Sequence, residues 1–225
     1  MTLFGKTVLV VGASGVLGGE FVRALAGRGA KVLAVSSTQE SAARIPAEAR
    51  LRLFADLTQP QSIDVLATYL LANWQLDGVI LAAGRVGFGG SQQTSVPQAA
   101  ALMQVNHLGP AQLVSKLIPN LVAGQEPYIS GITGVVAEKA FAGMNAYSAS
   151  KAAMSSWLDS LRIELKSSGV QVLEARPGHT ETGLASRPLF GMAPKMPAGM
   201  EPQHVVEVIL GGLIGGASLL TSKDF

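Results

Sequence analysis

The chain of 225 residues contains no cysteine. This absence excludes disulfide bonds, thiolate metal ligands and cysteine nucleophiles, and it leaves the redox compartment open. Charged residues are also scarce, at 14% of the chain, and the formal net charge is only +2. No run of three basic residues occurs, so the clustered positive charge typical of nucleic-acid-binding proteins is missing. We therefore expect no nucleic-acid partner.

Long hydrophobic runs are missing as well. The longest apolar stretch, 208–220, contains four glycines and is shorter than the roughly 20 apolar residues that a membrane-spanning helix needs. Residues 1–6 lack the layout of a signal peptide and lead directly into a strand-like segment. These features predict no membrane association, and the cytoplasm is the default location.

Hydrophobic residues make up 48% of the chain, which is enough for a globular core. Short β-branched runs alternate with longer helical patterns, as in βα units on a parallel sheet. The predicted strands are 7–11, 31–36, 50–54, 78–82, 127–130, 170–174 and 218–221. The predicted helices are 16–28, 40–45, 60–73, 96–122, 146–168 and 202–214. The pattern predicts one α/β domain over 1–225, a doubly wound parallel sheet (Rossmann fold) of about seven strands with helices on both faces.

One segment, 177–202, is irregular and rich in proline and glycine. A connection of this length between a strand and a helix is often an active-site lid, and we expect 183–201 to cover a substrate. Its apolar side chains are equally consistent with a pocket wall and with packing against the domain itself. They are Leu184, Leu189, Phe190, Met192, Met196 and Met200.

A glycine-rich turn follows the first predicted strand. In the stretch GASGVLG, residues 12–18, glycine lets the backbone turn tightly, and the amides that open the next helix face an anion. A structural turn would also use these glycines, but the position at the first strand–helix junction favours a pyrophosphate-binding loop. The cofactor contacts expected from this loop are Gly12, Ser14, Gly15, Leu17 and Gly18.

The ends of the next two predicted strands bear on which cofactor is bound. The second strand ends at Ser36 and Ser37, where an acidic residue would bind the ribose hydroxyls of NAD and repel a 2′-phosphate. The lack of an acid favours NADP(H) over NAD(H), although Arg44, the nearest arginine, stands well beyond the strand. Asp56 follows the third strand and suits two roles equally, accepting a hydrogen bond from adenine or capping the next helix.

Tyr147 and Lys151 lie four residues apart in the predicted helix 146–168, so they share one helical face. A free tyrosine has a pKa of about 10 and transfers protons poorly at neutral pH. A neighbouring ammonium stabilises the phenolate, lowers this pKa and brings proton transfer within reach. Lys151 also suits the ribose hydroxyls of a cofactor. Spacing alone is typical of an exposed pair, but the glycine loop upstream favours a catalytic pair.

The chain resembles the short-chain dehydrogenase/reductase family along nearly its whole length. Residues 147–151, YSASK, match the family's YxxxK catalytic motif, and the glycine loop resembles the GxxGxxG form of its cofactor loop. The resemblance implies that Asn106 supports the active-site lysine through a bound water. It also implies that the cofactor contacts include Asp56, Leu57, Ala83, Gly84, Tyr147, Lys151, Pro177, Gly178 and Thr182. Of these, the resemblance assigns Thr182 to the nicotinamide carboxamide.

Two segments depart from the family pattern. Residues 81–84, LAAG, stand where the family has Asn-Asn-Ala-Gly, so Ala83 and Gly84 keep the close backbone approach while the side-chain amides are lost. The position of the family's catalytic serine, which polarises the substrate carbonyl, falls on Gly134. Thr133 is the nearest hydroxyl, and we expect it to act in place of the serine. Without any hydroxyl, a donor worth about 2–4 kcal/mol of transition-state stabilisation would be missing.

The resemblance implies an oxidoreductase that interconverts carbonyl compounds and alcohols, as a homodimer or homotetramer built through the helices 96–122 and 146–168. The alternative is a dinucleotide-binding redox sensor or interaction protein with little catalysis, which the loss at Gly134 would suit. The retained Tyr147, Lys151 and Asn106 favour the enzyme. We expect no metal site, because the histidines lack ligand spacing. Of these, His107 should pack or be solvated, His204 should lie on the surface, and His179 stands near the expected nicotinamide.

Overall fold

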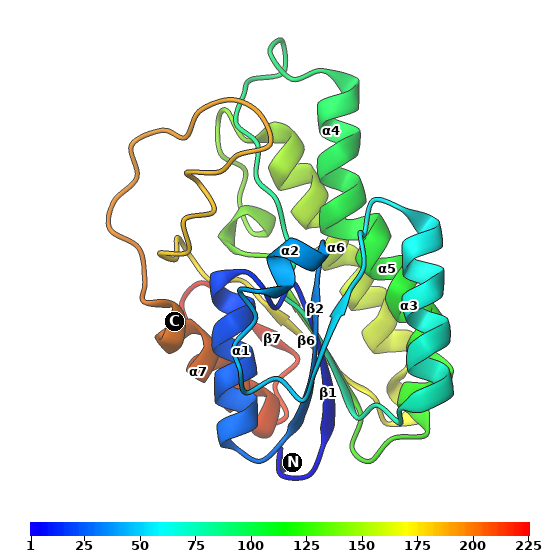
Figure 1. The fold of residues 1–225 in the computed structure, drawn as a ribbon. Helices are drawn as coiled ribbons and strands as arrows, with labels where there is room; N and C mark the ends of the chain where they lie inside the picture. The colour runs from blue at the N-terminus through cyan, green and yellow to red at the C-terminus, as the bar shows by residue number, and fades with distance from the viewer.

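A sheet of seven parallel strands forms the centre of the molecule in the computed structural model, which describes residues 1–225 (Figure 1). The strands are β1 (Thr7–Val11), β2 (Lys31–Ser36), β3 (Leu51–Phe54), β4 (Gly78–Leu81), β5 (Tyr128–Ile132), β6 (Gln171–Ala175) and β7 (Leu219–Leu220). Their order across the sheet is β3-β2-β1-β4-β5-β6-β7. The winding direction therefore reverses between β1 and β4, as the predicted doubly wound α/β fold requires. The fold prediction is confirmed.

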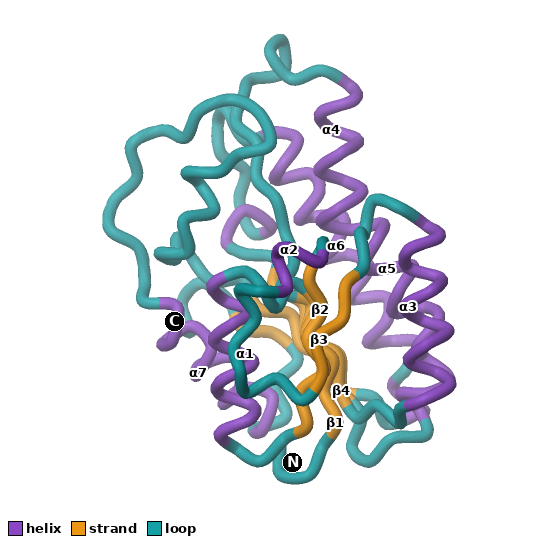
Figure 2. Tube along the Cα trace, viewed as in Figure 1, coloured by secondary structure: helices purple, strands orange, loops and turns teal.

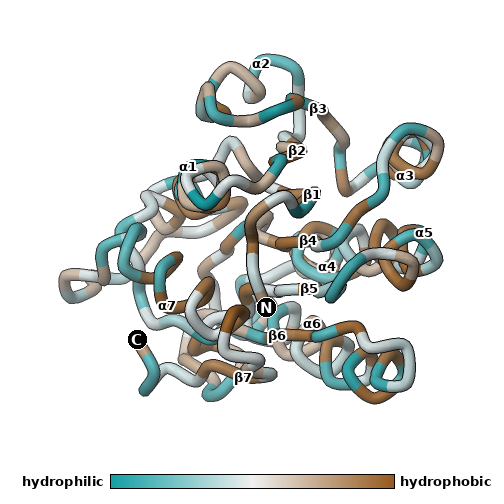
Figure 3. The backbone as a smooth tube through the Cα atoms, turned by 90° about the horizontal axis from the view of Figure 1, so that it is seen from below, coloured by the Kyte–Doolittle hydropathy of each residue, from teal (hydrophilic) through white to brown (hydrophobic).

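Helices cover both faces of this sheet. They are α1 (Val16–Gly27), α2 (Gln39–Ala42), α3 (Pro60–Asn73), α4 (Val96–Met103), α5 (Gly109–Val122), α6 (Asn145–Glu164) and α7 (Pro202–Ile214). Helices α1 and α7 pack on one face, and α3, α5 and α6 pack on the other (Figures 1 and 3). No helix combines the length and the apolar character needed to cross a membrane.

The alternation of side chains along the strands divides the core into two layers. In β1, Val8 and Val10 join the layer under α1 and α7, while Leu9 and Val11 join the layer under α3, α5 and α6. All four side chains are at most 1% exposed, and full burial of each contributes about 1.5–3 kcal/mol. Burial on both faces explains why this strand reads as a continuous apolar run.

The predicted helix 96–122 is interrupted. A π-helical turn, Gln104–Leu108, separates α4 from α5. Pro110 follows it and has no backbone N–H for the regular helical ladder. Gly109 packs so tightly on the loop after β3 that an added Cβ would lie 2.3 Å from the Leu57 carbonyl oxygen. Such π turns are frequent at functional sites, and this one carries Asn106.

The loops that follow the strands gather at the carboxyl edge of the sheet (Figure 2). The longest of them lies between β6 and α7 and contains no helix or strand beyond an isolated bridge between Thr180 and Met200. In open α/β sheets, ligands bind outside the carboxyl ends of the strands, next to the point where the winding direction reverses. The fold therefore places a ligand site beneath these loops.

Candidate active site

A cavity of about 1040 Å³ lies at this edge of the sheet. It is at the upper end of the range of about 300–1000 Å³ for small-molecule sites, so it has room for more than one small ligand. Its walls come from the glycine loop, the ends of β1, β2, β4 and β5, helix α6 and the loop after β6. Of the site residues predicted from the sequence, all except Asn106 line this cavity.

The glycine loop is packed too closely for any side chain at two of its positions. Gly12 has a φ of +88°, and a Cβ added there would lie 2.5 Å from the Ala83 amide nitrogen. A Cβ added at Gly18 would lie 2.1 Å from the carbonyl oxygen of Gly12. Helix α1 begins just after Gly15, and no side chain caps it. The first-turn amides at the mouth of the cavity are therefore available to an anion.

At the end of β2, the two serines differ. Ser36 is buried, and its hydroxyl proton is engaged within the protein, since it donates to the Thr38 carbonyl oxygen at 2.9 Å. Ser37 is exposed and lines the cavity. Arg44 lines the cavity too, and its guanidinium makes no hydrogen bond or ion pair within the protein. Arg44 stands well beyond β2 in the sequence, but the short helix α2 between them lets it reach the cavity.

Asp56 is held by its own loop. One carboxylate oxygen, Oδ1, accepts hydrogen bonds from the amide and the hydroxyl of Thr58, at 2.8 and 2.7 Å. The N-cap position of α3 belongs to Gln59, so Asp56 does not cap that helix, and one of its two expected roles is removed. The second carboxylate oxygen has no protein partner, and Asp56 lines the cavity.

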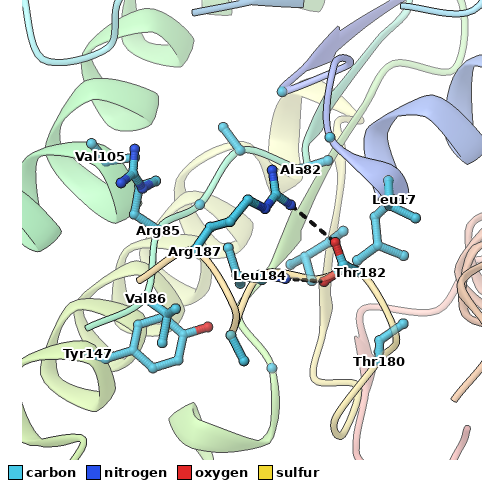
Figure 4. A pocket seen from close by; sticks show the side chains of 18 of the residues that line it. Leu17, Ala82, Arg85, Val86, Val105, Tyr147, Thr180, Thr182, Leu184 and Arg187 are labelled. Carbon is cyan, nitrogen blue, oxygen red and sulfur yellow. Dashed lines mark hydrogen bonds between the residues drawn. The ribbon is translucent and has the colours of Figure 1, made fainter. Parts of the chain in front are cut away.

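Tyr147 and Lys151 lie on the first two turns of α6, facing the cavity. Figure 4 shows the Tyr147 ring at the cavity wall, and its hydroxyl makes no hydrogen bond within the protein. Lys151 is buried, and its Nζ donates to the Ile132 carbonyl oxygen at 2.8 Å. Gly84 lies beside this ammonium, since a Cβ added there would be in van der Waals contact with Nζ at 3.5 Å.

Burial dominates the ionisation of this pair. It raises the pKa of Tyr147 to about 12 and lowers the pKa of Lys151 to about 8, because each charged form loses hydration. The direction for Tyr147 is opposite to the sequence-based expectation of a pKa lowered by the neighbouring ammonium. At neutral pH the tyrosine therefore carries its proton, which makes it a proton donor in this state.

Asn106 fixes the wall opposite α6. Its side-chain oxygen accepts from the Arg85 amide at 2.8 Å, and its Nδ2 donates to the Arg85 carbonyl oxygen and to the Ser150 hydroxyl, both at 2.9 Å. Asn106 is 2% exposed and does not itself line the cavity. These direct bonds tie Arg85, the residue after the LAAG segment, to the helix that carries Tyr147 and Lys151.

Thr133 lines the cavity, but its hydroxyl is already engaged. Thr133 Oγ1 donates to the Glu174 carboxylate at 2.5 Å, and the residue is 1% exposed. The same carboxylate accepts two bonds from the Arg176 guanidinium, at 2.8 and 2.9 Å. To polarise a substrate, the Thr133 hydroxyl would have to leave Glu174. Gly134 beside it has a φ of +82°, a conformation that L side chains rarely adopt.

The three histidines lie in different surroundings. His107 packs edge-on against Trp157, with ring centroids 6.2 Å apart, and His204 is exposed, as predicted for both. His179 lines the cavity, and its Nε2 lies 3.5 Å from a carboxylate oxygen of Glu181. No three His, Asp or Glu side chains come close enough together to hold a metal ion.

A family model described as short chain dehydrogenase matches residues 6–188 of the sequence. The chain belongs to the short-chain dehydrogenase/reductase family. The chain is therefore an oxidoreductase of an NAD(P)-binding family, and its glycine loop, its open helix N-terminus and the Lys151 ammonium beside Gly84 fit a dinucleotide.

Individual proteins are similar to this chain over almost its whole length. An uncharacterized oxidoreductase of Myxococcus xanthus (strain DK1622) is 29% identical over 94% of this chain and 85% of its own. A short-chain dehydrogenase from Burkholderia cenocepacia, solved with NADP, superposes with a TM-score of 0.86 at 26% identity, covering 98% of this chain and 89% of that one. One from Sphingobium yanoikuyae, solved with NADPH, gives 0.84 at 26% identity over 96% and 87%.

Three cavity residues of this family member escape motif-based reasoning. Arg44, Arg85 and Arg187 line the cavity, yet none belongs to a family motif used above. They come from the end of α2, from the position after LAAG, and from the loop after β6. Arg85 adjoins a motif, which is a weak signal. Sequence reasoning considered Arg44 but set it apart as lying well beyond the strand, and no pattern within 183–201 singles out Arg187.

Proposed function

We propose that this protein reduces an aldehyde or ketone to an alcohol with NADPH, or catalyses the reverse oxidation. The observation that carries the proposal is the Tyr147 hydroxyl, which has no protein partner and lies in one cavity with Lys151 and the glycine loop. Fold alone would not support a reaction, because related folds host unrelated chemistry. The paired side chains beside a dinucleotide loop do support one.

NADP(H) is the proposed cofactor. A 2′-phosphate at the end of β2 would meet the exposed Ser37 and the unpaired guanidinium of Arg44, and no acidic residue of that strand end would repel it. Two similar solved dehydrogenases contain NADP and NADPH, which is in keeping with this choice.

The bound nicotinamide would exchange a hydride with the substrate carbon. Tyr147, protonated at neutral pH because burial raises its pKa to about 12, would donate its proton to the carbonyl oxygen. Lys151 would bind the cofactor ribose beside it and favour the phenolate once the proton has left. Asn106 would position both by holding Arg85 and Ser150 in place.

Polarisation of the substrate carbonyl is the step for which the cavity offers the fewest suitable hydrogen-bond donors. Thr133 stays our candidate for the second hydrogen-bond donor, in the role that Gly134 has lost, provided that its hydroxyl turns away from Glu174. The segment 183–201 is our proposed substrate lid. It brings Leu184 and Met196 into the cavity wall, which suits an apolar substrate body.

The proposal is tested by titrating the purified protein with NADPH and NADH, following the fluorescence of the reduced nicotinamide. A panel of aldehydes and ketones is then monitored by loss of reduced-cofactor absorbance. We expect tighter binding of NADPH than of NADH and turnover of at least one carbonyl, which Tyr147→Phe abolishes. Tyr69→Phe, on the exposed part of α3, is the matched control and should turn over normally.

Two other results would change the assignment. Cofactor binding without turnover of any carbonyl would favour the redox sensor, with the loss of the serine at Gly134 as its physical reason. No binding of either dinucleotide would contradict the enzyme and the sensor alike.

A further inference from the structure

The charge lining the cavity is strongly unbalanced for a chain whose net charge is only +2. Three arginines and one lysine line the cavity together with a single carboxylate. The basic residues are Arg44, Arg85, Lys151 and Arg187, and the acidic one is Asp56. A concave site lined by one sign of charge concentrates the opposite charge in its ligands. The ligand is therefore expected to carry several negative charges.

The proposed function leaves the side chains of Arg85 and Arg187 without a role, and the surroundings of Arg187 are the more informative. Figure 4 shows its side chain reaching from the loop after β6 toward Thr182. Its Nε donates to the Gly183 carbonyl oxygen at 3.1 Å, and one terminal nitrogen donates to the Thr182 carbonyl oxygen at 3.2 Å. No carboxylate pairs with it. Because a guanidinium has five N–H donors, several remain for a ligand.

The backbone around Arg187 is anchored to the cavity wall. The Leu189 amide donates to the Val86 carbonyl oxygen at 2.7 Å, and the Phe88 amide donates to the Phe190 carbonyl oxygen at 3.0 Å. The loop is thus fixed two residues beyond Arg187. Fixing the backbone in advance lowers the entropy cost of placing this side chain on a ligand.

The location of the Arg187 guanidinium indicates which group of a dinucleotide it would bind. Arg187 hydrogen-bonds the backbone of Thr182, the residue that family resemblance assigns to the nicotinamide carboxamide. The glycine loop, assigned to the diphosphate, lines the same cavity. In a nicotinamide dinucleotide, the anion next to the nicotinamide riboside is the diphosphate. Arginine binds phosphate oxygens with paired, charge-assisted hydrogen bonds.

We propose that Arg187 binds the diphosphate of the cofactor from the lid side, opposite the helix N-terminus that follows the glycine loop. The diphosphate is then held between α1 and the segment 183–201, whose backbone is already anchored at Leu189 and Phe190. The inference rests on the proposed function, since it requires a dinucleotide in the cavity. A carboxylate of the substrate is the other source of the same anionic chemistry.

The experiment compares Arg187→Gln with Lys195→Gln, which removes one positive charge from the same loop but not from the cavity lining. Dissociation constants are measured by calorimetry for NADPH, ADP-ribose and 2′-AMP. ADP-ribose contains the diphosphate but no nicotinamide, and 2′-AMP contains no diphosphate. We expect Arg187→Gln to weaken NADPH and ADP-ribose about 10–100-fold, the loss typical of a hydrogen bond to a charged group, and to leave 2′-AMP unchanged. Lys195→Gln should alter none of them.

The possible results distinguish a failure of the Arg187 inference from a failure of the proposed function. If the wild-type protein binds NADPH and ADP-ribose and Arg187→Gln binds them equally well, the inference fails while the proposed function stands. If Arg187→Gln instead raises KM only for carboxylate-bearing carbonyl substrates, Arg187 recognises the substrate and the diphosphate assignment is wrong. If the wild-type protein binds none of the three ligands, the proposed function fails and the inference fails with it.

Discussion

At the scale of single residues, Lys151 illustrates a conflict between function and stability. Its ammonium is buried with one backbone carbonyl as partner, and burial lowers its pKa from 10.5 to about 8. The folded state thus disfavours the charged form, and this penalty is present below about pH 8. Between about pH 8 and 10.5 the unfolded chain binds more protons than the folded one, so stability rises with pH in that window.

We therefore predict that Lys151→Met has a flatter pH profile of stability. Relative to this variant, the wild-type free energy of unfolding should rise by about 2 kcal/mol from about pH 7 to about pH 9.5. Urea unfolding followed by circular dichroism at both pH values measures the difference. Parallel profiles for the two proteins would mean that Lys151 is not destabilised by burial.

Thr133 is the residue at which a structural and a catalytic role can be separated. Its hydroxyl is bonded to buried Glu174, so Thr133→Val should lower the free energy of unfolding by about 1–3 kcal/mol, whereas Thr133→Ser should lower it less. The kinetics of the same variants decide whether Thr133 also has a catalytic role. A loss of kcat on the order of 100-fold in Thr133→Val, restored by Thr133→Ser, would make Thr133 the carbonyl donor. Unchanged kcat would restrict it to holding Glu174.

At the scale of elements, the turn from β1 into α1 depends on the absence of side chains. Gly18→Ala would place a Cβ 2.1 Å from the Gly12 carbonyl oxygen, so the loop must shift. We expect a loss of about 1–3 kcal/mol, as for overpacked sites, together with weaker cofactor binding. Gly27→Ala at the other end of the same helix meets nothing within 4 Å and should be neutral or stabilising by up to about 1 kcal/mol. Thermal unfolding of both variants, with and without NADPH, measures the contrast.

The elements also show what sequence patterns can and cannot predict. Helices 60–73 and 202–214 have the predicted bounds, and a proline at the first position of each is typical of a first turn. The π turn at Gln104–Leu108 could not be predicted, since it depends on the packing of Gly109 against a loop about 50 residues earlier. Local periodicity reports burial on one face of a helix but carries no information on such contacts.

The same distinction between local patterns and long-range contacts applies to the candidate site. Tyr147 and Lys151 belong to one helix turn, so their spacing predicts their common face. The engagement of Thr133 by Glu174 and the approach of Arg187 to the cavity join segments that lie far apart in the sequence. Such contacts follow from the topology of the sheet and of the loop after β6. Local motifs in a single sequence do not specify them.

At the scale of the whole molecule, the helices predicted to form subunit interfaces keep large apolar side chains at the surface. Val96 of α4 is 83% exposed and Ile163 of α6 is 78% exposed, and Leu108 of the π turn and Val122 at the end of α5 are exposed as well. Scattered apolar residues are normal on a surface. Helix α3 exposes apolar side chains too, among them Val65 at 72%, so it is the family resemblance that selects α4, α5 and α6 for the expected homodimer or homotetramer.

We predict that the 23.2 kDa chain forms dimers or tetramers through these helices. A stable interface buries about 1200–2000 Å², and a charge placed at its centre opposes association. Ile163→Glu combined with Leu108→Glu should therefore dissociate the assembly, which light scattering after size exclusion detects. Val65→Glu on α3 changes an equally exposed apolar residue outside the proposed interface and should leave the mass unchanged. A wild-type protein that is monomeric at micromolar concentration would contradict the prediction, and its cavity would then have to be complete within a single chain.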